Sequence, residues 1–321
     1  MNVRYGIIGL GSIANKFADA VNREKELDLV AVAARDQARA DEFARKNKAA
    51  RAYGKYASII ADPDVDIIYI GVTHNFHYDI VKECLANHRA VLCEKPLVLT
   101  KKEAEELADL AKKNNTLLME AMWTRCMPAY LKAQEWVRSG KIGAVQLIDA
   151  NFCFLGTYDP ESRWYNPKLA GGSLFDLGVY PIEFSTGITG ENPVSVSGVA
   201  KIAPTGVDEA AAVGMTFPGG ALASFSCGFT TEAMDEAIIY GTKGKIVLEN
   251  CFGPMKAELF EGRDKRVGKF EEKVPNGFIY EARHCASLFR EGKQQSNLIP
   301  LEDTITCAGV FDILRKQWGL I

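Results

Sequence analysis

Histidine is scarce in this sequence, and its cysteines do not come in pairs. The 321 residues contain four histidines, at positions 74, 77, 88 and 284, and eight cysteines without any Cys-x-x-Cys spacing. The histidines are not spaced as metal ligands, so no metal site is expected. Cysteines scattered through apolar stretches, such as Cys93, Cys153 and Cys227, are typical of reduced thiols. The composition therefore predicts a cytoplasmic protein without a disulfide framework.

A large excess of charge and a long apolar run are also missing. The formal net charge is -3 at pH 7, and Lys and Arg form no stripe interleaved with aromatic residues, which argues against a nucleic-acid partner. No apolar run is long enough to cross a bilayer, and the beginning lacks the pattern of a secretory leader, so no membrane partner is expected. Hydrophobic residues make up 47% and charged residues 25% of the chain, as in a globular enzyme, and the length favours two domains.

The first third of the chain alternates between strand-like and helix-like segments. Such alternation predicts βαβ units and a doubly wound parallel sheet. After Trp123 the pattern changes, and from residue 144 on β-rich segments follow one another with turn signals between them, which predicts a largely antiparallel sheet. The predicted fold class is therefore α/β, with an N-terminal Rossmann domain over residues 1–122. A C-terminal α+β domain with an open, mixed sheet is expected over residues 123–321.

The sequence Gly-Leu-Gly-Ser-Ile-Ala follows the first predicted strand and opens a predicted helix. In this G-x-G-x-x-A fingerprint, Gly9 permits the tight turn and Gly11 leaves room for a pyrophosphate at the helix N-terminus. Ser12 and Ile13 lie in the same turn, and Ala14 keeps the helix close to the strand. The loop predicts a dinucleotide cofactor.

The end of the second predicted strand bears on which dinucleotide binds. The chain reads Ala-Ala-Arg-Asp at residues 33–36, where NAD-binding domains carry an acidic residue for the ribose 2′-hydroxyl. Arg35 after a small residue suits the 2′-phosphate of NADP. Asp36 either binds the hydroxyl or caps the next helix. NADP is expected, and NAD stays open.

Polar residues also follow two further strands. Ligands bind outside the carboxyl ends of parallel strands. Glu94 and Lys95 end a strand just before a proline, so both are expected at the cofactor crevice. Lys95 is expected there as a positioned positive charge and not as a solvated surface lysine. The cluster Thr73, His74, Asn75 and His77 follows another strand end and is expected to line the same crevice. His77 either touches the nicotinamide ribose or starts a helix.

Trp123 and Arg125 come just after the last strand of the first domain. If the topology holds, both face the cofactor crevice, where Trp123 forms either a stacking wall or a packing contact. Arg163 and Trp164 lie in a loop before a later predicted helix and are expected to line the substrate site. His284 fits one face of a predicted helix and is expected to be a satisfied structural histidine.

Several of these motifs together resemble a known family. The glycine loop, the Glu-Lys-Pro triplet and the stretch GGSLFDLGVYPI at residues 171–182 resemble the glucose–fructose oxidoreductase / inositol dehydrogenase (Gfo/Idh/MocA) family. Residues 119–128, residues 163–183 and the C-terminal stretch resemble more narrowly its dimeric dihydrodiol dehydrogenase branch, which includes NADP-linked D-xylose dehydrogenases. The resemblance spans nearly the whole chain.

The resemblance implies roles for three residues. Lys95 matches the lysine that hydrogen-bonds the reacting oxygen. Asp176 and Tyr180 match a motif of the second domain, four residues apart on a predicted helix and so on one face. Many family members have His where this chain has Tyr180. Tyr180 is the expected proton acceptor, a nearby Lys95 ammonium favours its phenolate, and Asp176 orients Lys95 or binds a substrate hydroxyl.

The predicted function is hydride transfer between NADP and a secondary alcohol or carbonyl of a sugar or cyclic diol. Two alternatives keep the enzyme class: a trans-dihydrodiol dehydrogenase and an NADPH-dependent reductase of dicarbonyl sugars. A third is a non-catalytic regulator that binds the dinucleotide. The second domain has few helices to cover its sheet, and an uncovered sheet face needs a partner. A homodimer or higher homo-oligomer is therefore expected.

Overall fold

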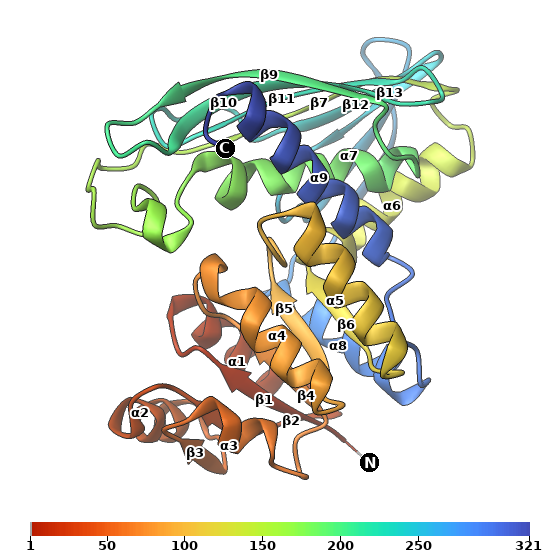
Figure 1. Ribbon diagram of the computed structural model, residues 1–321. Helices are drawn as coiled ribbons and strands as arrows, with labels where there is room; N and C mark the ends of the chain where they lie inside the picture. The colour runs from red at the N-terminus through yellow and green to blue at the C-terminus, as the bar shows by residue number, and fades with distance from the viewer. Residues whose placement is uncertain (1) are drawn as a thin grey trace. The chain divides into compact units, whose positions relative to one another are not determined.

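The computed structural model describes residues 2–321, which divide into two units (Figure 1). Unit 1 contains residues 2–98, Lys102–Ala121 and Pro275–Leu301. Unit 2 contains Leu99–Lys101, Met122–Val274 and Glu302–Ile321.

Unit 1 is built on a six-stranded sheet in which all neighbouring strands are parallel. Across the sheet the strands are β3 (Arg51–Tyr53), β2 (Leu27–Ala33), β1 (Val3–Ile8), β4 (Ile67–Ile70), β5 (Ala90–Glu94) and β6 (Leu118–Ala121). The helices are α1 (Ser12–Arg23), α2 (Gln37–Asn47), α3 (Tyr56–Ile60), the 3-10 turn η1 (His74–Phe76), α4 (His77–Ala86), α5 (Lys101–Lys113, from its second residue) and α8 (Phe278–Arg290). This order is that of a Rossmann fold and confirms the predicted parallel sheet; the short β3 and α3 were not predicted.

The segment Pro275–Leu301 belongs to unit 1, whereas the sequence had assigned all of residues 123–321 to the second domain. Its helix α8 packs against α1 and supplies a carbonyl group to the sheet, since the buried hydroxyl of Tyr5 donates to Ala282 O at 2.8 Å. The sequence does not predict the contact between Tyr5 and Ala282, because all strands of the second sheet lie between these two residues in the chain.

Unit 2 contains a mixed, largely antiparallel sheet, as predicted. The strands of its main path are β15 (Lys265–Glu271), β14 (Lys256–Glu261), β13 (Gly244–Leu248), β12 (Ala237–Gly241), β7 (Val145–Ala150), β11 (Leu222–Gly228), β10 (Asp208–Thr216) and β9 (Ser195–Ile202), and β8 (Phe152–Cys153) pairs with β11. Among the described strand pairs of this second sheet, only those that β11 makes with β7 and β8 are parallel. The helical segments are η2 (Trp123–Cys126), α6 (Pro128–Arg138), η3 (Pro167–Leu169), η4 (Leu174–Gly178), α7 (Val179–Thr189) and α9 (Leu301–Gln317, from its second residue).

One face of the second sheet packs on the helices of its own unit. Ile148, Ile239 and Ile246 pair across β7, β12 and β13 and are fully buried on this face. Helices α6 and α7 contact these central strands, and the indole of Trp318, just after α9, donates to Gly198 O in β9 at 2.9 Å. The core of unit 2 therefore lies between this face and its helices.

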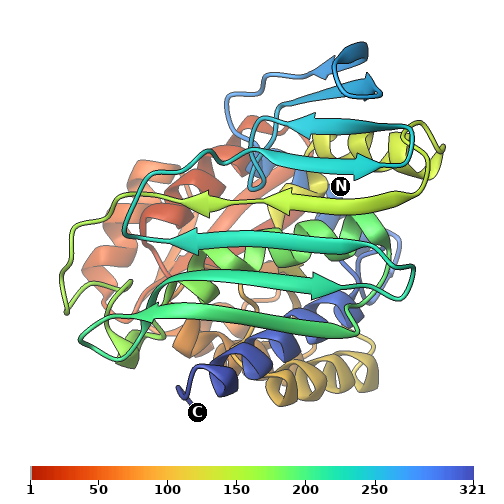
Figure 2. The ribbon, with the colours of Figure 1, turned by 90° about the horizontal axis from the view of Figure 1, so that it is seen from above.

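The opposite face of this sheet is seen in Figure 2. Over the described part of unit 2, no helix of that unit crosses it. Leu147 pairs with both Leu222 and Tyr240, so these three side chains share this face, and Leu222 is 49% exposed. The open sheet expected from the sequence is thus present, and its outer face carries apolar side chains. Among residues 2–321, no helix combines the length and the hydropathy needed to cross a membrane.

Candidate active site

The glycine loop has the geometry that a pyrophosphate needs. Gly9 has a φ of +89°, and a Cβ there would lie 2.8 Å from the backbone of Gly71. At Gly11, by contrast, a Cβ would meet no described atom within 4 Å apart from those of Gly11 and its two chain neighbours. Helix α1 begins at Ser12, and its residue Ala14 is fully buried. The helix N-terminus therefore faces open space, which fits an anionic group at the free N–H groups.

Arg35 and Asp36 differ in what they contact. The Asp36 carboxylate accepts a hydrogen bond of 2.8 Å from the backbone of Arg39 and caps α2. Arg35 is exposed, and its guanidinium carbon lies 5.6 Å from the ring centre of Phe76. Asp36 thus caps α2. Arg35, which follows β2, lies beside the ring of Phe76.

The cluster after β4 forms a tight turn. Thr73 precedes the 3-10 turn that contains His74 and Asn75, and His77 begins α4. The His77 ring is fully buried, with one nitrogen 2.9 Å from Pro96 O and the other 3.1 Å from Val72 O, and burial lowers the pKa of His77. His77 therefore ties the end of β4 to the turn that holds Lys95.

Glu94 is the last residue of β5, and Lys95 follows it. Both are nearly buried, with 7% and 9% of their surfaces exposed. The Tyr69 hydroxyl donates to Glu94 Oε1 at 2.5 Å. Burial is the main cause of the lowered pKa of His77, and the positive charge of Lys95 lowers it further. Two nearly buried charged side chains therefore lie at the carboxyl end of β5.

In unit 2, Asp176 and Tyr180 lie on one helical segment. The sequence predicted a regular α-helix, but Asp176 lies in a π-helical turn, Leu174–Gly178, which continues directly into α7 at Val179. Both side chains are nearly buried. Arg163 donates from Nη1 to Asp176 Oδ1 at 3.2 Å and from Nη2 to Oδ2 at 3.0 Å. Widened turns of this kind are frequent at functional sites.

Aromatic side chains surround Tyr180. Its ring lies edge-on to Phe152, with 5.4 Å between ring centres, and 6.3 Å from Phe252. Trp164 packs against Phe154 at 5.1 Å between ring centres. None of the three phenylalanines was singled out in the sequence, because β8 and the loop that follows β13 carry no motif.

Trp123 and Arg125 make their described contacts inside unit 2. Trp123 packs so closely on Gly253 that a Cβ there would lie 2.3 Å from the indole. Arg125 is 1% exposed, and its guanidinium donates to Glu183 O at 2.8 Å and forms an ion pair of 2.5 Å with Asp303. These contacts give Arg125 a structural role in unit 2.

The cysteines lack the chemistry of a nucleophile. All eight are buried and free of disulfide bonds. Burial raises the pKa of Cys84 and of Cys285 to about 12, so their thiolates are scarce at neutral pH.

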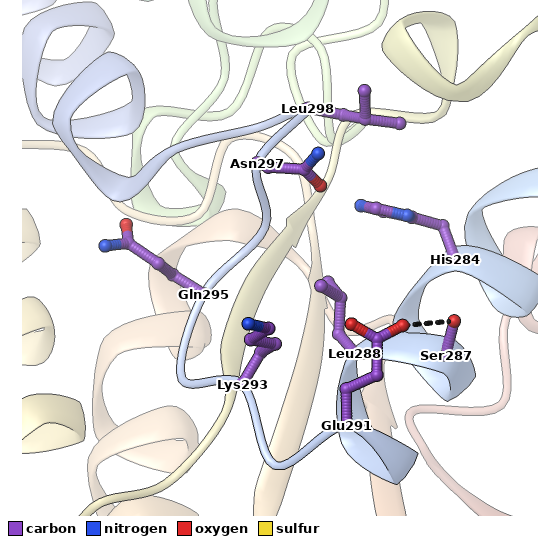
Figure 3. A pocket seen from close by; sticks show the side chains of 8 residues that line it. All are labelled: His284, Ser287, Leu288, Glu291, Lys293, Gln295, Asn297 and Leu298. Carbon is purple, nitrogen blue, oxygen red and sulfur yellow. Dashed lines mark hydrogen bonds between the residues drawn. The ribbon is translucent and has the colours of Figure 1, made fainter.

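A pocket of about 570 Å³ lies in unit 1 between α8 and the segment that follows it (Figure 3). None of its lining residues belongs to the predicted cofactor or substrate site. His284 is at its wall, and its Nε2 lies 2.7 Å from the Ser296 hydroxyl, which in turn accepts backbone hydrogen bonds from Leu298 and Ile299. His284 is therefore a satisfied structural residue, as predicted.

Comparisons with known proteins agree with this geometry. Residues 3–122 match the family model of the Gfo/Idh/MocA oxidoreductases with an NAD-binding Rossmann fold, and residues 130–247 match the C-terminal domain of the same family. The chain is 35% identical over 329 residues to a mouse trans-1,2-dihydrobenzene-1,2-diol dehydrogenase, covering all of this chain and 98% of that protein. The human protein of that name is 34% identical, with the same coverage.

Solved structures share the fold. A levoglucosan dehydrogenase in complex with NADH superposes with a TM-score of 0.90 at 21% identity, covering 99% of this chain and 98% of that one. An aldose-aldose oxidoreductase from Caulobacter crescentus gives 0.89 at 22% identity, covering 98% and 97%. The fold and its relatives define a nicotinamide-dependent oxidoreductase that acts on CH–OH groups. The chain belongs to the Gfo/Idh/MocA family.

Proposed function

We propose that this enzyme is an NADP-dependent dehydrogenase of a secondary alcohol in a sugar or a cyclic diol, with Lys95, Tyr180 and Asp176 as its catalytic residues. The observation that carries the proposal is the buried Lys95 at the carboxyl end of β5, where ligands bind in parallel sheets. A buried ammonium group costs free energy to desolvate, so its retention there favours a chemical role.

The proposed steps follow from the chain's own side chains. Lys95 donates a hydrogen bond to the reacting oxygen, and Tyr180 accepts the hydroxyl proton during oxidation and returns it during reduction. Asp176, held by Arg163, orients a second substrate hydroxyl. When bound, the nicotinamide supplies the hydride chemistry.

The cofactor is expected to be held by the first turns of unit 1. The loop with Gly9 and Gly11 leaves space for the pyrophosphate, and the turn that contains His74 and Asn75 follows the neighbouring strand β4. Arg35 beside Phe76 favours a 2′-phosphate, and therefore NADP over NAD, because Asp36 already accepts a hydrogen bond from its own helix.

A cyclic diol is the second candidate substrate. Phe152 and Phe252 lie against Tyr180, so an apolar ring face finds aromatic partners there. The charged pair of Arg163 and Asp176 favours a substrate rich in hydroxyl groups. The relatives named for trans-1,2-dihydrobenzene-1,2-diol support the diol. The NADPH-dependent reduction of a dicarbonyl sugar is the other alternative. The matches to named dehydrogenases lend no support to a non-catalytic regulator.

The test is a panel of pentoses, hexoses and trans-cyclic diols, each assayed with NADP+ and NAD+. Lys95→Met should bind NADPH with nearly unchanged affinity and lose at least about 100-fold in kcat on the best substrate. Lys82→Met, which changes an exposed lysine of the same unit, is the control and should resemble the wild type. Unchanged turnover in Lys95→Met would remove Lys95 from the chemistry.

The enzyme is also proposed to form a homodimer through the outer face of the unit 2 sheet. Leu147, Leu222 and Tyr240 lie side by side on that face. Apolar faces of this kind are covered by partners in many proteins, and a second copy presents the same surface.

A further inference from the structure

Asp208 is fastened to the start of the helical segment that carries Asp176 and Tyr180. It is the first residue of β10 and is 3% exposed. Its Oδ2 accepts a hydrogen bond of 2.8 Å from the Ser173 hydroxyl and one of 2.7 Å from the backbone N–H of Leu174. The first N–H groups of a helix lack partners within the helix. The carboxylate of a distant strand thus acts as the cap of this segment.

Gly172 lets the backbone come this close to the carboxylate. Its φ is +130°, and a Cβ at that position would lie 2.5 Å from Asp208 Oδ1. Any larger residue would push the carboxylate away from the turn or strain the backbone. The glycine before Ser173 therefore belongs to the same arrangement, and it explains why the turn begins with glycine, serine and leucine in this order.

We propose that Asp208 is a positioning residue: its ionised carboxylate holds the π-helical turn in the arrangement that presents Asp176 and Tyr180 to the substrate. The inference rests on the proposed roles of those two residues. Asp176 lies two residues beyond Leu174, inside the turn, so any shift of the anchored N–H group moves it directly. A misplacement of about 1 Å at a reacting group can cost about 100-fold in rate.

The surroundings make this anchor sensitive to pH. Burial raises the pKa of Asp208 to about 6, against the lowering effects of the Leu174 and Ser173 hydrogen bonds and of the Arg315 charge on α9. From β11 the neutral thiol of Cys227 lies 3.7 Å from the Ser173 hydroxyl. The carboxylate becomes neutral as the pH falls through this range and then binds the N–H group less strongly.

The charged neighbour in the chain is already paired. Glu209 follows Asp208, and its carboxylate forms an ion pair of 2.7 Å with Lys201 in β9. Of these two neighbouring carboxylates, Asp208 is the one that accepts hydrogen bonds from the start of the turn.

The experiment compares the wild type with Asp208→Asn, Ser173→Ala and Tyr180→Phe, measuring kcat and both KM values from pH 5 to 9 on the best substrate of the panel. In the wild type, kcat should fall on the acid side with a midpoint near pH 6. Asp208→Asn should lower kcat at pH 8 by about 10- to 100-fold, flatten the acid limb and leave the KM for the cofactor unchanged.

Ser173→Ala tests the same anchor without removing it. Loss of the hydroxyl removes one hydrogen bond that favours the ionised carboxylate, so the acid midpoint of kcat should move to higher pH while kcat at pH 9 stays within about twofold. A merely structural serine would change stability and leave the midpoint in place. Asp149→Asn, on β7 of the same sheet, is the control and should keep the wild-type profile.

The outcomes separate this inference from the proposed function. Wild-type turnover in Tyr180→Phe would overturn the proposed function and, with it, the inference. An inactive Tyr180→Phe together with an unchanged rate and pH profile in Asp208→Asn would overturn the inference alone. If Asp208→Asn does not fold, Ser173→Ala decides, and an unshifted midpoint in that variant overturns the inference.

Discussion

Arg163 holds both carboxylate oxygens of Asp176, at 3.2 and 3.0 Å, from a loop that precedes the helical segment in the chain. The Asp176 side chain is 8% exposed, whereas half of the Arg163 side chain reaches solvent. A two-point contact of this kind fixes both the charge and the orientation of the carboxylate. The loop arginine therefore prepares Asp176 for a substrate hydroxyl.

Replacing Arg163 should affect turnover more than stability. In Arg163→Met, kcat/KM for the best polyhydroxylated substrate should fall about tenfold, because Asp176 loses the two-point contact that fixes its orientation. The free energy of unfolding should change by about 1 kcal/mol at most, since the arginine is half exposed. Steady-state kinetics and thermal unfolding measure the two effects.

A matched control exists in unit 1. Arg283 is likewise 50% exposed and pairs with Glu24, so Arg283→Met should cost similar stability and leave kcat/KM unchanged. Equal kinetic losses in the two variants would contradict the role given to Arg163.

Arg35 should determine the choice of cofactor. In Arg35→Ser, kcat/KM for NADP should fall about 10- to 100-fold, because a charged contact to the 2′-phosphate is lost, while the value for NAD stays near that of the wild type. The ratio of the two values is the measurement. Arg39→Ser, which removes an exposed arginine one turn along α2, should leave the ratio unchanged. A wild-type ratio in Arg35→Ser would show that the 2′-phosphate is not bound there.

Glu281 should make the protein less stable at higher pH. It lies fully buried on α8, and among residues 2–321 no group donates a hydrogen bond to its carboxylate oxygens. Burial, and next the negative charge of Glu94, raise the pKa of Glu281 well above its usual value. The folded protein therefore binds a proton that the unfolded chain releases near pH 4.5, so stability is lost as the pH rises from there through the folded-state pKa.

Glu281→Gln removes this titration and keeps the shape of the neutral carboxyl group. The variant should be close to the wild type at pH 4 and increasingly more stable above it, by about 1.4 kcal/mol for each pH unit within the window. Denaturant unfolding at a series of pH values measures the difference. The exposed Glu42 offers the control, Glu42→Gln, which should follow the wild type. A constant difference between Glu281→Gln and the wild type would show that Glu281 is ionised in the folded protein.

The outer face of the unit 2 sheet should carry the dimer. Leu222→Glu places a charge in the apolar row beside Leu147 and Tyr240, and burying that charge in an interface would cost several kcal/mol. Light scattering at micromolar concentration should therefore report a monomer for this variant and a dimer for the wild type. Ile313→Glu changes a 45% exposed side chain on α9 and should leave the mass unchanged. A monomeric wild type would remove the proposal.

The parts of the site that the sequence predicts are those whose residues lie close together in the chain. The glycine loop, the Glu94–Lys95 pair and the Asp176–Tyr180 spacing each lie within one strand–turn–helix segment, where local geometry follows from residue type. The same reasoning found most strands of both sheets, because burial on one or both faces leaves a period in the sequence. It missed the short β3 and the largely exposed β15.

The parts that it missed depend on contacts between distant segments. Asp208 and Ser173 are 35 residues apart, and nothing in the sequence around either one points to the other. Arg125 follows a strand end, as a cofactor residue would, but Asp303 is 178 residues away and pairs with it. The widened turn around Asp176 was also missed, because a π-turn has the same residue preferences as the α-helix it interrupts.

The position of Pro275–Leu301 in unit 1 bears on the order in which the two units can fold during synthesis. The hydroxyl of Tyr5 contacts a carbonyl group that lies 277 positions later in the chain. During synthesis, the first sheet therefore lacks helix α8 until the segment Met122–Val274 of unit 2 has been made. Unit 1 can therefore be completed only after most of unit 2 has been synthesised.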